Sequence, residues 1–506
     1  MRPITIIVFV SALLMGAFFL IESVFFHNEK ITAEENNESY KYLKKPCWFD
    51  ADWQADISCG ELHTPSRSGK FILPVVILHP EQLTQKDPVV YLQGGPGASA
   101  GLHSEGIKRW LSWMRLANIK RDLILLDVRG TGKSKPALVC AEYNRTNQQL
   151  LREHKTLSEE LAQSFSVTGQ CFKEAMLQDP SLDYRNFSTR LSAQDVRALM
   201  AQLDYTEWNI LGVSYGTRLA LEVARQEQQL PQSVRLRSMV LDSIYPAGYG
   251  GVQTWPQVLD AALQKFFKGC PRLPDCSNHL KNNQDKLQEL FMSALARLRD
   301  NPMTITIKHW DGEAPMRWVV NDHRFLSIVF AGIYEPNDWS KIADAVQAVH
   351  DGRSDLLKPL AEPYLNHSVS SDFNSLTFTA VDCADNPVFP EADYLNAVAQ
   401  YPLLQNYTRD QWRYQLCHQL PSVAALELVK PLVPTLILAG AQDPITPVQW
   451  ARQIHEQWPE SQLRVSEDLA HSVLGSDVCL LENIASFFDQ PNVAFTACTS
   501  LARLSN

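Results

Sequence analysis

The feature that most limits how this chain can fold is a serine that lies between a short apolar run and an amphipathic stretch. The sequence Gly-Val-Ser-Tyr-Gly at 212–216 follows the apolar run Trp208–Leu211 and precedes a helical pattern over Thr217–Gln226. A G-x-S-x-G sequence between a strand and a helix predicts a tight turn that holds the serine hydroxyl above the end of a sheet. The start of the helix also favours negative charge that develops there during a reaction. Ser214 is therefore the predicted nucleophile.

The same pattern occurs a second time, around Ser99, in the sequence Gly-Ala-Ser-Ala-Gly at 97–101. Ser99 lies well past the end of the expected strand Val89–Leu92, whereas the serine of such a turn follows its strand within about three residues. We therefore expect that Ser99 is not the nucleophile. The small residues around it are expected to let a loop run close to the site.

Apolar runs and amphipathic stretches alternate along much of the chain. Helical patterns cover Ser192–Leu203 and Thr217–Gln226. The runs with the length and composition of strands are Phe71–Leu78, Val89–Leu92, Leu123–Asp127, Trp208–Leu211, Met239–Asp242, Thr435–Ala439 and Gln462–Ser466. Alternating strands and helices predict an α/β fold in which a mostly parallel sheet is flanked by helices on both faces.

Residues 246–430 interrupt this alternation. The segment favours helices, is rich in Trp and Pro, and contains four of the ten cysteines. We interpret it as a large, mainly helical cap (lid) that is inserted into the α/β core. The core is then built from two parts of the chain, residues 31–245 and 431–506.

The N-terminus differs from the rest of the chain. Ile4–Ile21 is a run of 18 uncharged residues, and Arg2 precedes it. This pattern predicts an export signal peptide or a short signal anchor within residues 1–30. The sequence leaves open whether the segment is cleaved. We expect a periplasmic or extracellular protein, whose only membrane contact is this segment if it is kept.

The ten cysteines agree with export, because an even number in an exported chain is typical of disulfide-bonded proteins. The spacing does not determine their connectivity. As a hypothesis, sequential pairing closes short loops: Cys47–Cys59, Cys140–Cys171, Cys270–Cys276, Cys383–Cys417 and Cys479–Cys498.

Composition and motifs exclude several function classes. The net charge of −10 gives no basic surface for a nucleic-acid partner. Neither C-x-x-C nor H-E-x-x-H occurs, so we expect no metal and no cofactor. Residues 127–134 end in Gly-Lys-Ser after a strand, but Asp127 stands where a phosphate loop needs its first glycine. A structural turn is the better interpretation. The sequence does not determine the oligomeric state.

Chain order indicates the acid and the base. Hydrolases with this kind of serine turn place an Asp or Glu after it, and then a His. Asp443 follows the expected strand Thr435–Ala439, and His471 follows the last expected strand. His471 would take the proton of Ser214 and Asp443 would hold the tautomer of the imidazole. Asp468 is a rival acid, but it lies too close to His471 in sequence to reach the ring from a separate strand.

Several motifs taken together resemble one family. They are Gly-Gly-Pro-Gly at 94–97, D-x-R-G-x-G-x-S at 127–134, G-x-S-Y-G at 212–216, Asp-Ser-Ile-Tyr-Pro at 242–246, and then Asp443 and His471. This set is similar to the proline iminopeptidase and tripeptidyl aminopeptidase family of α/β-hydrolases, over residues 46–490. Gln93 stands where the family usually has His. Tyr215 stands where proline iminopeptidases usually have Trp, which favours the tripeptidyl branch.

The resemblance implies a fold and a set of roles. It implies the α/β-hydrolase fold and a serine exopeptidase that releases single residues or tripeptides from peptides with free N-termini. It also implies that Ser214, Asp443 and His471 form the catalytic triad. The backbone N–H groups of Gly95 and Tyr215 would then bind the oxyanion that forms on the substrate carbonyl.

An exopeptidase of this kind has to bind the ammonium group of its substrate. A partly buried cation needs a carboxylate partner. The segment Val-Asp-Cys-Ala-Asp-Asn-Pro at 381–387 is similar to an acidic segment of the tripeptidyl relatives. Asp385 is the first candidate for binding the substrate N-terminus and Asp382 the second. The alternative interpretation is that both are solvated loop acids.

Two other functions are compatible with the same core. A carboxylic-ester hydrolase would use the same serine chemistry, since fold does not determine function. Its substrate has no ammonium group, so it would not need the acidic segment. A non-catalytic binding module would be expected to lack a member of the triad, and none is missing from this sequence.

Overall fold

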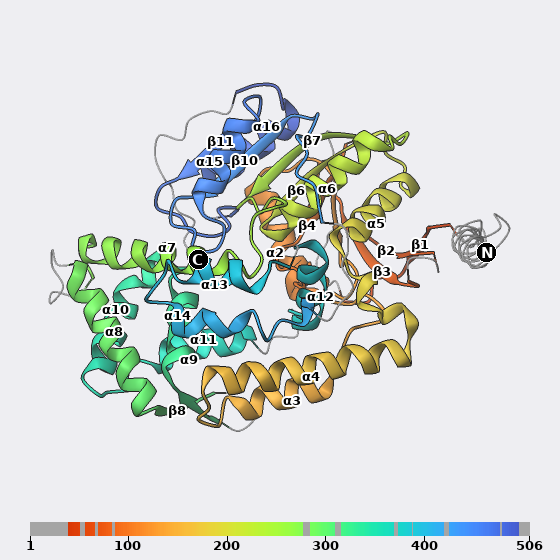
Figure 1. Cartoon of the computed structure of the whole chain (residues 1–506). Coiled ribbons are helices and arrows are strands. Elements are labelled where there is room, and N and C mark those ends of the chain that lie inside the picture. The colour runs from red at the N-terminus through yellow and green to blue at the C-terminus, as the bar shows by residue number, and fades with distance from the viewer. Residues whose placement is uncertain are drawn as a thin grey trace, which may run out of the picture. The chain divides into compact units, whose positions relative to one another are not determined.

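A sheet of nine strands organises the molecule, in the order β1-β2-β3-β5-β4-β6-β7-β10-β11 (Figure 1). The computed structural model describes residues 39–50, 56–65, 69–82, 87–276, 284–308, 315–368, 373–386, 388–418, 425–475 and 478–494. The predicted N-terminal export segment, residues 1–30, lies outside these ranges. Among the described residues, no helix is both long enough and apolar enough to cross a bilayer.

The strands of the sheet run in two directions. Their bounds are β1 Lys41–Lys45, β2 Ile57–His63, β3 Ile72–Leu78, β4 Val89–Leu92, β5 Leu123–Leu126, β6 Glu207–Val213, β7 Arg235–Asp242, β10 Thr435–Gly440 and β11 Gln462–Ser466. The pairs β1–β2, β2–β3 and β3–β5 are antiparallel, and all pairs from β5 to β11 are parallel. The predicted mostly parallel sheet is therefore confirmed. The seven predicted strands all form, whereas β1 and β2 were not predicted.

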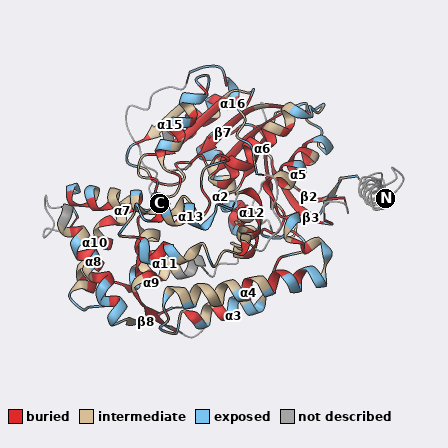
Figure 2. Cartoon of the chain, viewed as in Figure 1, coloured by how far each residue is buried: buried red, intermediate tan, exposed pale blue. Residues whose placement is uncertain are grey.

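Burial on both faces explains why the interior strands could be predicted from apolar runs in the sequence. Every residue of β4, β5 and β10 is buried, which matches the continuous apolar runs expected for parallel strands covered on both faces. The edge strand β1, which carries the sequence Lys-Tyr-Leu-Lys-Lys, is mostly exposed and has no such run. This is why periodicity did not reveal it. Figure 2 shows the same contrast, with buried residues concentrated along the strands of the sheet.

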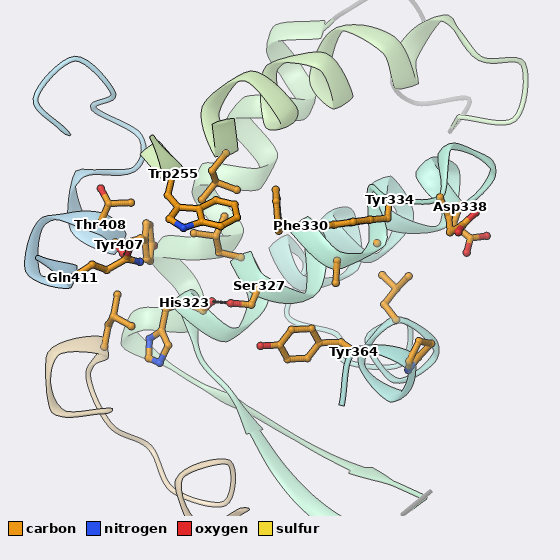
Figure 3. Close-up of a pocket in the computed structure, with 18 of the residues that line it drawn as sticks. Trp255, His323, Ser327, Phe330, Tyr334, Asp338, Tyr364, Tyr407, Thr408 and Gln411 are labelled. Atoms are coloured by element: carbon orange, nitrogen blue, oxygen red, sulfur yellow. Dashed lines mark hydrogen bonds between the residues drawn. The ribbon is translucent and has the colours of Figure 1, made fainter. Parts of the chain in front are cut away.

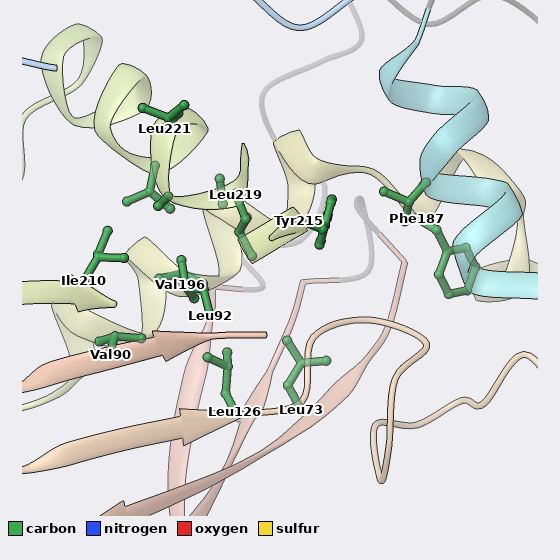
Figure 4. Close-up of a cluster of buried hydrophobic side chains, with 14 of the residues drawn as sticks. Leu73, Val90, Leu92, Leu126, Phe187, Val196, Ile210, Tyr215, Leu219 and Leu221 are labelled. Carbon is green, nitrogen blue, oxygen red and sulfur yellow. The ribbon is translucent and has the colours of Figure 1, made fainter. Parts of the chain in front are cut away.

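Successive residues of a strand point to opposite faces, and helices cover both faces of this sheet. On one face, Val90 and Leu92 of β4 belong to a core with α5 (Thr189–Gln202), α6 (Tyr215–Gln229) and α15 (Val448–Gln457). Figure 4 shows part of this core, where side chains of the strands meet those of α5 and α6. On the other face, Val89 and Tyr91 pack with residues of α2 (Ser104–Leu116) and α16 (Val478–Asp489).

The chain between β7 and β10 forms a mainly helical layer with a core of its own. Its elements are α7 Trp255–Gly269, α8 Gln284–Asp300, β8 Met303–Ile307, β9 Met316–Val320, α9 Asp322–Gly332, α10 Trp339–His350, α11 Lys358–Ser368, α12 Ser375–Asp385, α13 Glu391–Val398 and α14 Gln405–Thr408. The strands β8 and β9 pair as an antiparallel hairpin. Large buried residues such as Phe266, Phe291 and Trp318 fill the core of this layer. We keep the name cap for these elements; the boundaries 246 and 430 stay a prediction.

A second part of the chain also reaches the cap, which was not predicted. The helices α3 (Ala141–Leu150) and α4 (Leu157–Gln178) follow β5, and one end of this helix pair lies next to β8 (Figure 1). The carbonyl of Leu151 accepts a hydrogen bond of 2.9 Å from the N–H of Val319, and Arg324 forms an ion pair with Glu160. The cap layer is therefore built from two separate segments of the sequence.

Four of the five hypothesised disulfides are present. They are Cys47–Cys59, Cys140–Cys171, Cys270–Cys276 and Cys383–Cys417. The fifth, Cys479–Cys498, cannot be compared because Cys498 lies outside the described residues. Cys140–Cys171 joins the start of α3 to α4, and Cys383–Cys417 joins α12 to a later turn of the cap.

Candidate active site

Ser214 lies at the junction of β6 and α6, in a backbone conformation that serine rarely adopts. Its φ is 55° and its ψ is −121°, and such a conformation costs about 1–3 kcal/mol for a residue other than glycine. The flanking glycines make the turn sterically feasible. A Cβ atom on Gly216 would lie 1.9 Å from the carbonyl oxygen of Leu92, and one on Gly212 would lie 2.6 Å from the carbonyl oxygen of Gly216. The predicted serine turn is therefore present, and the close packing of β4, β6 and α6 holds Ser214 in this strained conformation at the carboxyl end of β6.

His471 and Asp443 come together as the sequence order predicted. The Nδ1 atom of His471 lies 2.8 Å from Oδ2 of Asp443. Asp443 follows β10 and is 2% exposed, and His471 follows β11. The contact at Nδ1 leaves Nε2 as the nitrogen that can exchange a proton with a substrate or a nucleophile.

Thr446 is a site residue that sequence reasoning missed. Its hydroxyl donates to Oδ2 of Asp443 at 2.6 Å and lies 3.3 Å from Nδ1 of His471. The backbone N–H groups of Ile445 and Thr446 donate to Oδ1 of Asp443, both at 2.9 Å. The only sequence signal for this role is a hydroxyl residue three positions after the acid, which is too common to have been singled out.

The electrostatics of the pair follow from these contacts. Burial by itself would raise the pKa of Asp443, but the charge of His471 and the hydrogen bonds from His471 and Thr446 hold it below its ordinary value. Burial disfavours the imidazolium of His471, but Asp443 outweighs that effect and holds the pKa of His471 above its ordinary value. The pair therefore stabilises positive charge on the imidazole, which a general base gains when it accepts a proton.

Ser214 and His471 line one cavity of about 450 Å³. The wall is largely aromatic. The core contributes Tyr91, Tyr245 and Trp450, and the cap contributes Trp255, Tyr334, Phe373 and Phe378. The rings of Tyr334 and His471 meet edge to face, with centroids 5.7 Å apart. No carboxylate occurs among the described residues that line this cavity.

The Gly-Gly-Pro-Gly loop borders the same cavity. Gly94 and Gly95 both line it. Gly94 lies against the nucleophile, since a Cβ atom there would be 3.2 Å from Cβ of Ser214 and 3.7 Å from its Oγ. Tyr215 is the first residue of α6, so its N–H is one that the helix leaves without an internal partner. Of the predicted oxyanion donors, Gly95 lines the cavity and Tyr215 follows Ser214 directly, although Gly94 is the glycine in contact with Ser214.

The D-x-R-G motif supports this loop. Asp127 is buried and accepts hydrogen bonds of 2.8 Å from the N–H groups of Ala100 and Lys133. Its Oδ1 also accepts one from the hydroxyl of Ser99 at 3.3 Å. Arg129 forms a fully buried ion pair with Asp195 of α5. The motif is a structural turn, and the hydroxyl of Ser99 is directed at Asp127 instead of the cavity of Ser214.

The Asp-Ser-Ile-Tyr-Pro motif positions the loop of His471. Asp242 ends β7 and accepts hydrogen bonds from the N–H groups of Val473 at 3.1 Å and Leu474 at 2.8 Å. The hydroxyl of Ser243 accepts one from the N–H of Ser472 at 2.9 Å. Burial raises the pKa of Asp242 to about 6. These bonds fix the three residues on the C-terminal side of His471.

The two acids predicted to bind the substrate ammonium are placed elsewhere. Asp382 and Asp385 lie in the last turn of α12, not in a loop, and neither lines the cavity of Ser214. Asp385 accepts a hydrogen bond of 2.6 Å from the hydroxyl of Thr189 and lies 3.8 Å from Nη1 of Arg218. Oδ1 of Asp382 accepts one from Nδ2 of Asn386 at 2.7 Å.

The physical reason for this placement is a buried cation that the sequence does not reveal. Arg218 lies on α6, one turn after Ser214, and is 2% exposed. A buried guanidinium needs carboxylate and carbonyl acceptors, and Asp385 supplies a carboxylate across the interface between α6 and α12. Burial raises the pKa of Asp385 to about 6. The pair ties the cap to the helix that carries Ser214.

A lysine of the cap also contacts the site. Nζ of Lys265, on α7, donates to the carbonyl of Ala441 at 2.7 Å and lies 3.5 Å from that of Asp443. Burial lowers the pKa of Lys265. The sequence did not indicate this contact, because nothing near residue 265 marks a partner in a loop about 180 residues later.

Comparisons with known proteins agree with this geometry. Residues 87–477 match the family model for the alpha/beta hydrolase fold. Serine protease Hip1 of Mycobacterium tuberculosis is 23% identical over 454 residues, which cover 85% of this chain and 84% of that protein. The tripeptidyl aminopeptidase of Streptomyces lividans is 23% identical over 460 residues, which cover 85% of this chain and 81% of that protein. Because the family model spans most of the sequence, the chain belongs to the α/β-hydrolase fold family, and its protease relatives support a serine hydrolase.

Proposed function

We propose that this chain is an exported serine exopeptidase that releases residues from peptides with free N-termini. The observation that carries the proposal is one cavity that contains both Ser214 and His471, with His471 bonded to the buried Asp443. The similarity to the tripeptidyl aminopeptidase of Streptomyces lividans supports the choice of peptide substrates.

The proposed reaction uses the residues in the roles that the sequence predicted. Oγ of Ser214 attacks the substrate carbonyl while Nε2 of His471 accepts its proton, and the positive charge is stabilised by Asp443. The N–H of Tyr215 and one from the Gly94–Gly95 segment bind the oxyanion. His471 then protonates the leaving amine, which gives an acyl-enzyme, and a water molecule activated by His471 hydrolyses it.

The position of the cap favours cleavage near the end of a peptide substrate. Trp255 and Tyr334 of the cap, together with Phe373, complete the wall of the cavity that holds Ser214. A wall of this kind leaves room for the end of a peptide, whereas a long chain passing through the site would need an open groove on both sides. An aromatic lining also favours apolar side chains next to the bond that is cut.

Export is supported by the disulfides. Four cysteine pairs are bonded among the described residues, and such bonds persist in oxidising compartments. Together with the apolar run at Ile4–Ile21, they favour a periplasmic or extracellular location.

A panel of chromogenic peptide amides tests the proposal. One-, two- and three-residue p-nitroanilides are compared with free and with acetylated N-termini, and a p-nitrophenyl ester serves as a substrate without an amine. We expect hydrolysis of the amides with a clear preference for free N-termini. A preference for esters, with no difference between free and acetylated peptides, would instead favour the carboxylic-ester hydrolase.

A further inference from the structure

The turn that follows Asp443 supplies most of the hydrogen bonds to its carboxylate. A carboxylate can accept about four hydrogen bonds. The N–H groups of Ile445 and Thr446 donate to Oδ1, both at 2.9 Å, and the hydroxyl of Thr446 donates to Oδ2 at 2.6 Å. Nδ1 of His471 lies 2.8 Å from the same Oδ2. The turn therefore fixes the carboxylate, and Thr446 and His471 share its Oδ2 atom.

Thr446 lies in a rigid and buried part of this turn. Pro444 and Pro447 restrict the backbone on both sides of it. Thr446 is 5% exposed and Asp443 is 2% exposed, so water competes little for the bond between them. The hydroxyl of Thr446 also lies 3.3 Å from Nδ1 of His471. Its bond to the carboxylate is much shorter, and the hydroxyl therefore acts mainly on Asp443.

Two other charged groups face the pair of Asp443 and His471. Burial lowers the pKa of His471, Asp443 raises it, and the charge of Asp242 at the end of β7 adds a smaller rise. Nζ of Lys265, on α7, lies 3.5 Å from the carbonyl oxygen of Asp443. Asp242 bonds to the loop of His471 and Lys265 bonds to backbone carbonyls, so neither occupies Oδ2 of Asp443. Both stay in place when Thr446 is replaced.

The cap adds an aromatic contact to the same pair. Tyr334 meets His471 edge to face, with ring centroids 5.7 Å apart. Figure 3 shows Tyr334 in line with Phe330 and Trp255 along the wall of a second cavity, of about 700 Å³, within the cap. Burial raises the pKa of Tyr334 far above its ordinary value, so the phenol is neutral wherever the enzyme is assayed. Tyr334 therefore packs against His471 without a change of charge.

We propose that Thr446 is a positioning residue of the triad, whose hydroxyl orients the carboxylate of Asp443 toward His471 and shares its negative charge. The inference rests on the triad of the proposed function and not on the choice of peptide substrates. Burial by itself raises the pKa of Asp443, and the hydrogen bonds of Thr446 are among the contacts that lower it. Without the hydroxyl, the carboxylate is more basic and less firmly oriented. It then holds the proton of the imidazolium more tightly.

The test compares Thr446→Val with the wild type, because this change removes the hydroxyl and keeps the backbone N–H. We expect kcat on a peptide p-nitroanilide, at a pH where His471 is neutral, to fall about 10- to 100-fold, as for the loss of a hydrogen bond to a charged group. KM should stay within about twofold. The midpoint of the acidic limb of kcat/KM should move to higher pH by about half a unit or more, because a more basic carboxylate raises the pKa of His471. Asp443→Asn should move this midpoint in the opposite direction.

Three further variants separate the hydroxyl from the packing. Thr446→Ser keeps the hydroxyl and should keep the wild-type midpoint and most of the rate. Thr64→Val is the matched control, because it removes an equally buried hydroxyl that bonds to the carbonyl of Gly69 at 2.6 Å, outside the cavity of Ser214. It should leave kcat and the midpoint unchanged. Thermal denaturation shows whether each variant is folded, and Thr446→Ala replaces Thr446→Val if the valine variant does not fold.

A fluorophosphonate probe makes the test independent of the substrate. Oγ of Ser214 forms a bond to phosphorus, fluoride leaves, and His471 accepts the proton of the hydroxyl. The labelling rate as a function of pH therefore reports the same midpoint. If the wild type hydrolyses esters and no peptides, the exopeptidase fails, whereas the labelling rates still test Thr446. If Ser214→Ala is labelled as fast as the wild type, the triad is wrong, and the inference fails with it.

The remaining outcomes concern Thr446 alone. Wild-type kcat and labelling rate in Thr446→Val would overturn the inference. A loss of rate with a midpoint that stays in place or moves to lower pH would also overturn it, because Thr446 would then act by packing and not through the charge of Asp443. Failure of Thr446→Ser to keep the activity would lead to the same conclusion.

Discussion

At the scale of single residues, the proposed chemistry depends on a serine held in a strained turn. Ser214 adopts a positive φ of 55° because Gly212 and Gly216 allow β6, α6 and the end of β4 to approach. The conformation places the hydroxyl at the start of α6 and in the cavity of His471. A second serine in the same sequence pattern, Ser99, lacks this placement.

Replacing the two serines one at a time distinguishes them. Ser214→Ala should lower kcat by several orders of magnitude, on the order of 10⁶, because no other hydroxyl takes its place in the turn. Ser99→Ala loses only hydrogen bonds to Asp127 and Gly101 and should keep most of the activity. Steady-state kinetics on a peptide amide measures both. A reversal of the two results would contradict the assignment of the nucleophile.

The pKa of His471 sets the acidic limb of the pH profile. His471 must be neutral to accept the proton of Ser214, so activity is lost as pH falls through its pKa. Asp443 holds that pKa above the ordinary value of 6.5, so the midpoint should lie above this value in the free enzyme. Asp443→Asn removes the negative charge that raises the pKa of His471. It should therefore move the midpoint to lower pH and also lower the maximal rate. The pH dependence of kcat/KM measures the shift; an unmoved midpoint would exclude His471 as the titrating base.

At the scale of elements, buried polar contacts tie the cap to the catalytic helix and to the loop of the acid. Asp385 of α12 accepts from Thr189 of α5 and faces Arg218 of α6. Lys265 of α7 donates to the loop that carries Asp443. Such contacts act on the position of the triad without touching a substrate.

Asp385→Ala should therefore affect stability and not the choice of substrate. The change removes the carboxylate that accepts from the N–H and the hydroxyl of Thr189 and that forms the ion pair with Arg218. Breaking a buried pair in this way costs about 3–5 kcal/mol. We expect the midpoint of urea denaturation to fall, while the folded variant keeps the wild-type ratio of activities on free and acetylated peptides. Normal stability with loss of that ratio would restore Asp385 as the residue that binds the substrate ammonium.

At the scale of the whole molecule, disulfides join separate elements of the cap layer. Cys140–Cys171 and Cys383–Cys417 close loops of 31 and 34 residues. The first disulfide links the start of α3 to α4, the two helices that join the cap from the first part of the core. The second links α12 to the turn at Leu416–His418. The cap thus depends on covalent links as well as on its own apolar core.

Removing one of these links should destabilise the protein measurably. Restricting the unfolded chain by a loop of this length contributes about 3–4 kcal/mol. Replacing Cys140 and Cys171 together by serine should lower the free energy of unfolding by about that amount. Urea denaturation of the double variant measures the loss, and thiol titration of denatured, unreduced wild type should find close to no free thiol. Several free thiols would contradict the disulfides and, with them, the argument for export.

Features that depend on local pattern could be predicted from the amino-acid sequence. The buried parallel strands could be predicted because strands covered on both faces must be apolar throughout. The turn at Ser214 could be predicted because only small flanking residues allow it, and the order of Asp443 and His471 follows from which strand ends meet at one edge of the sheet. Sequential pairing also predicted four disulfides, since all four close short loops.

Contacts between segments that are distant in the chain could not be predicted, because they depend on how the folded elements pack. The tertiary structure placed Asp385 against Arg218, brought Thr446 to Asp443, and joined α3 and α4 to the cap. A carboxylate has the same side chain whether it pairs with a buried arginine or faces a cavity. Its role depends on which groups the packing brings within a few ångströms, and local sequence carries no record of that.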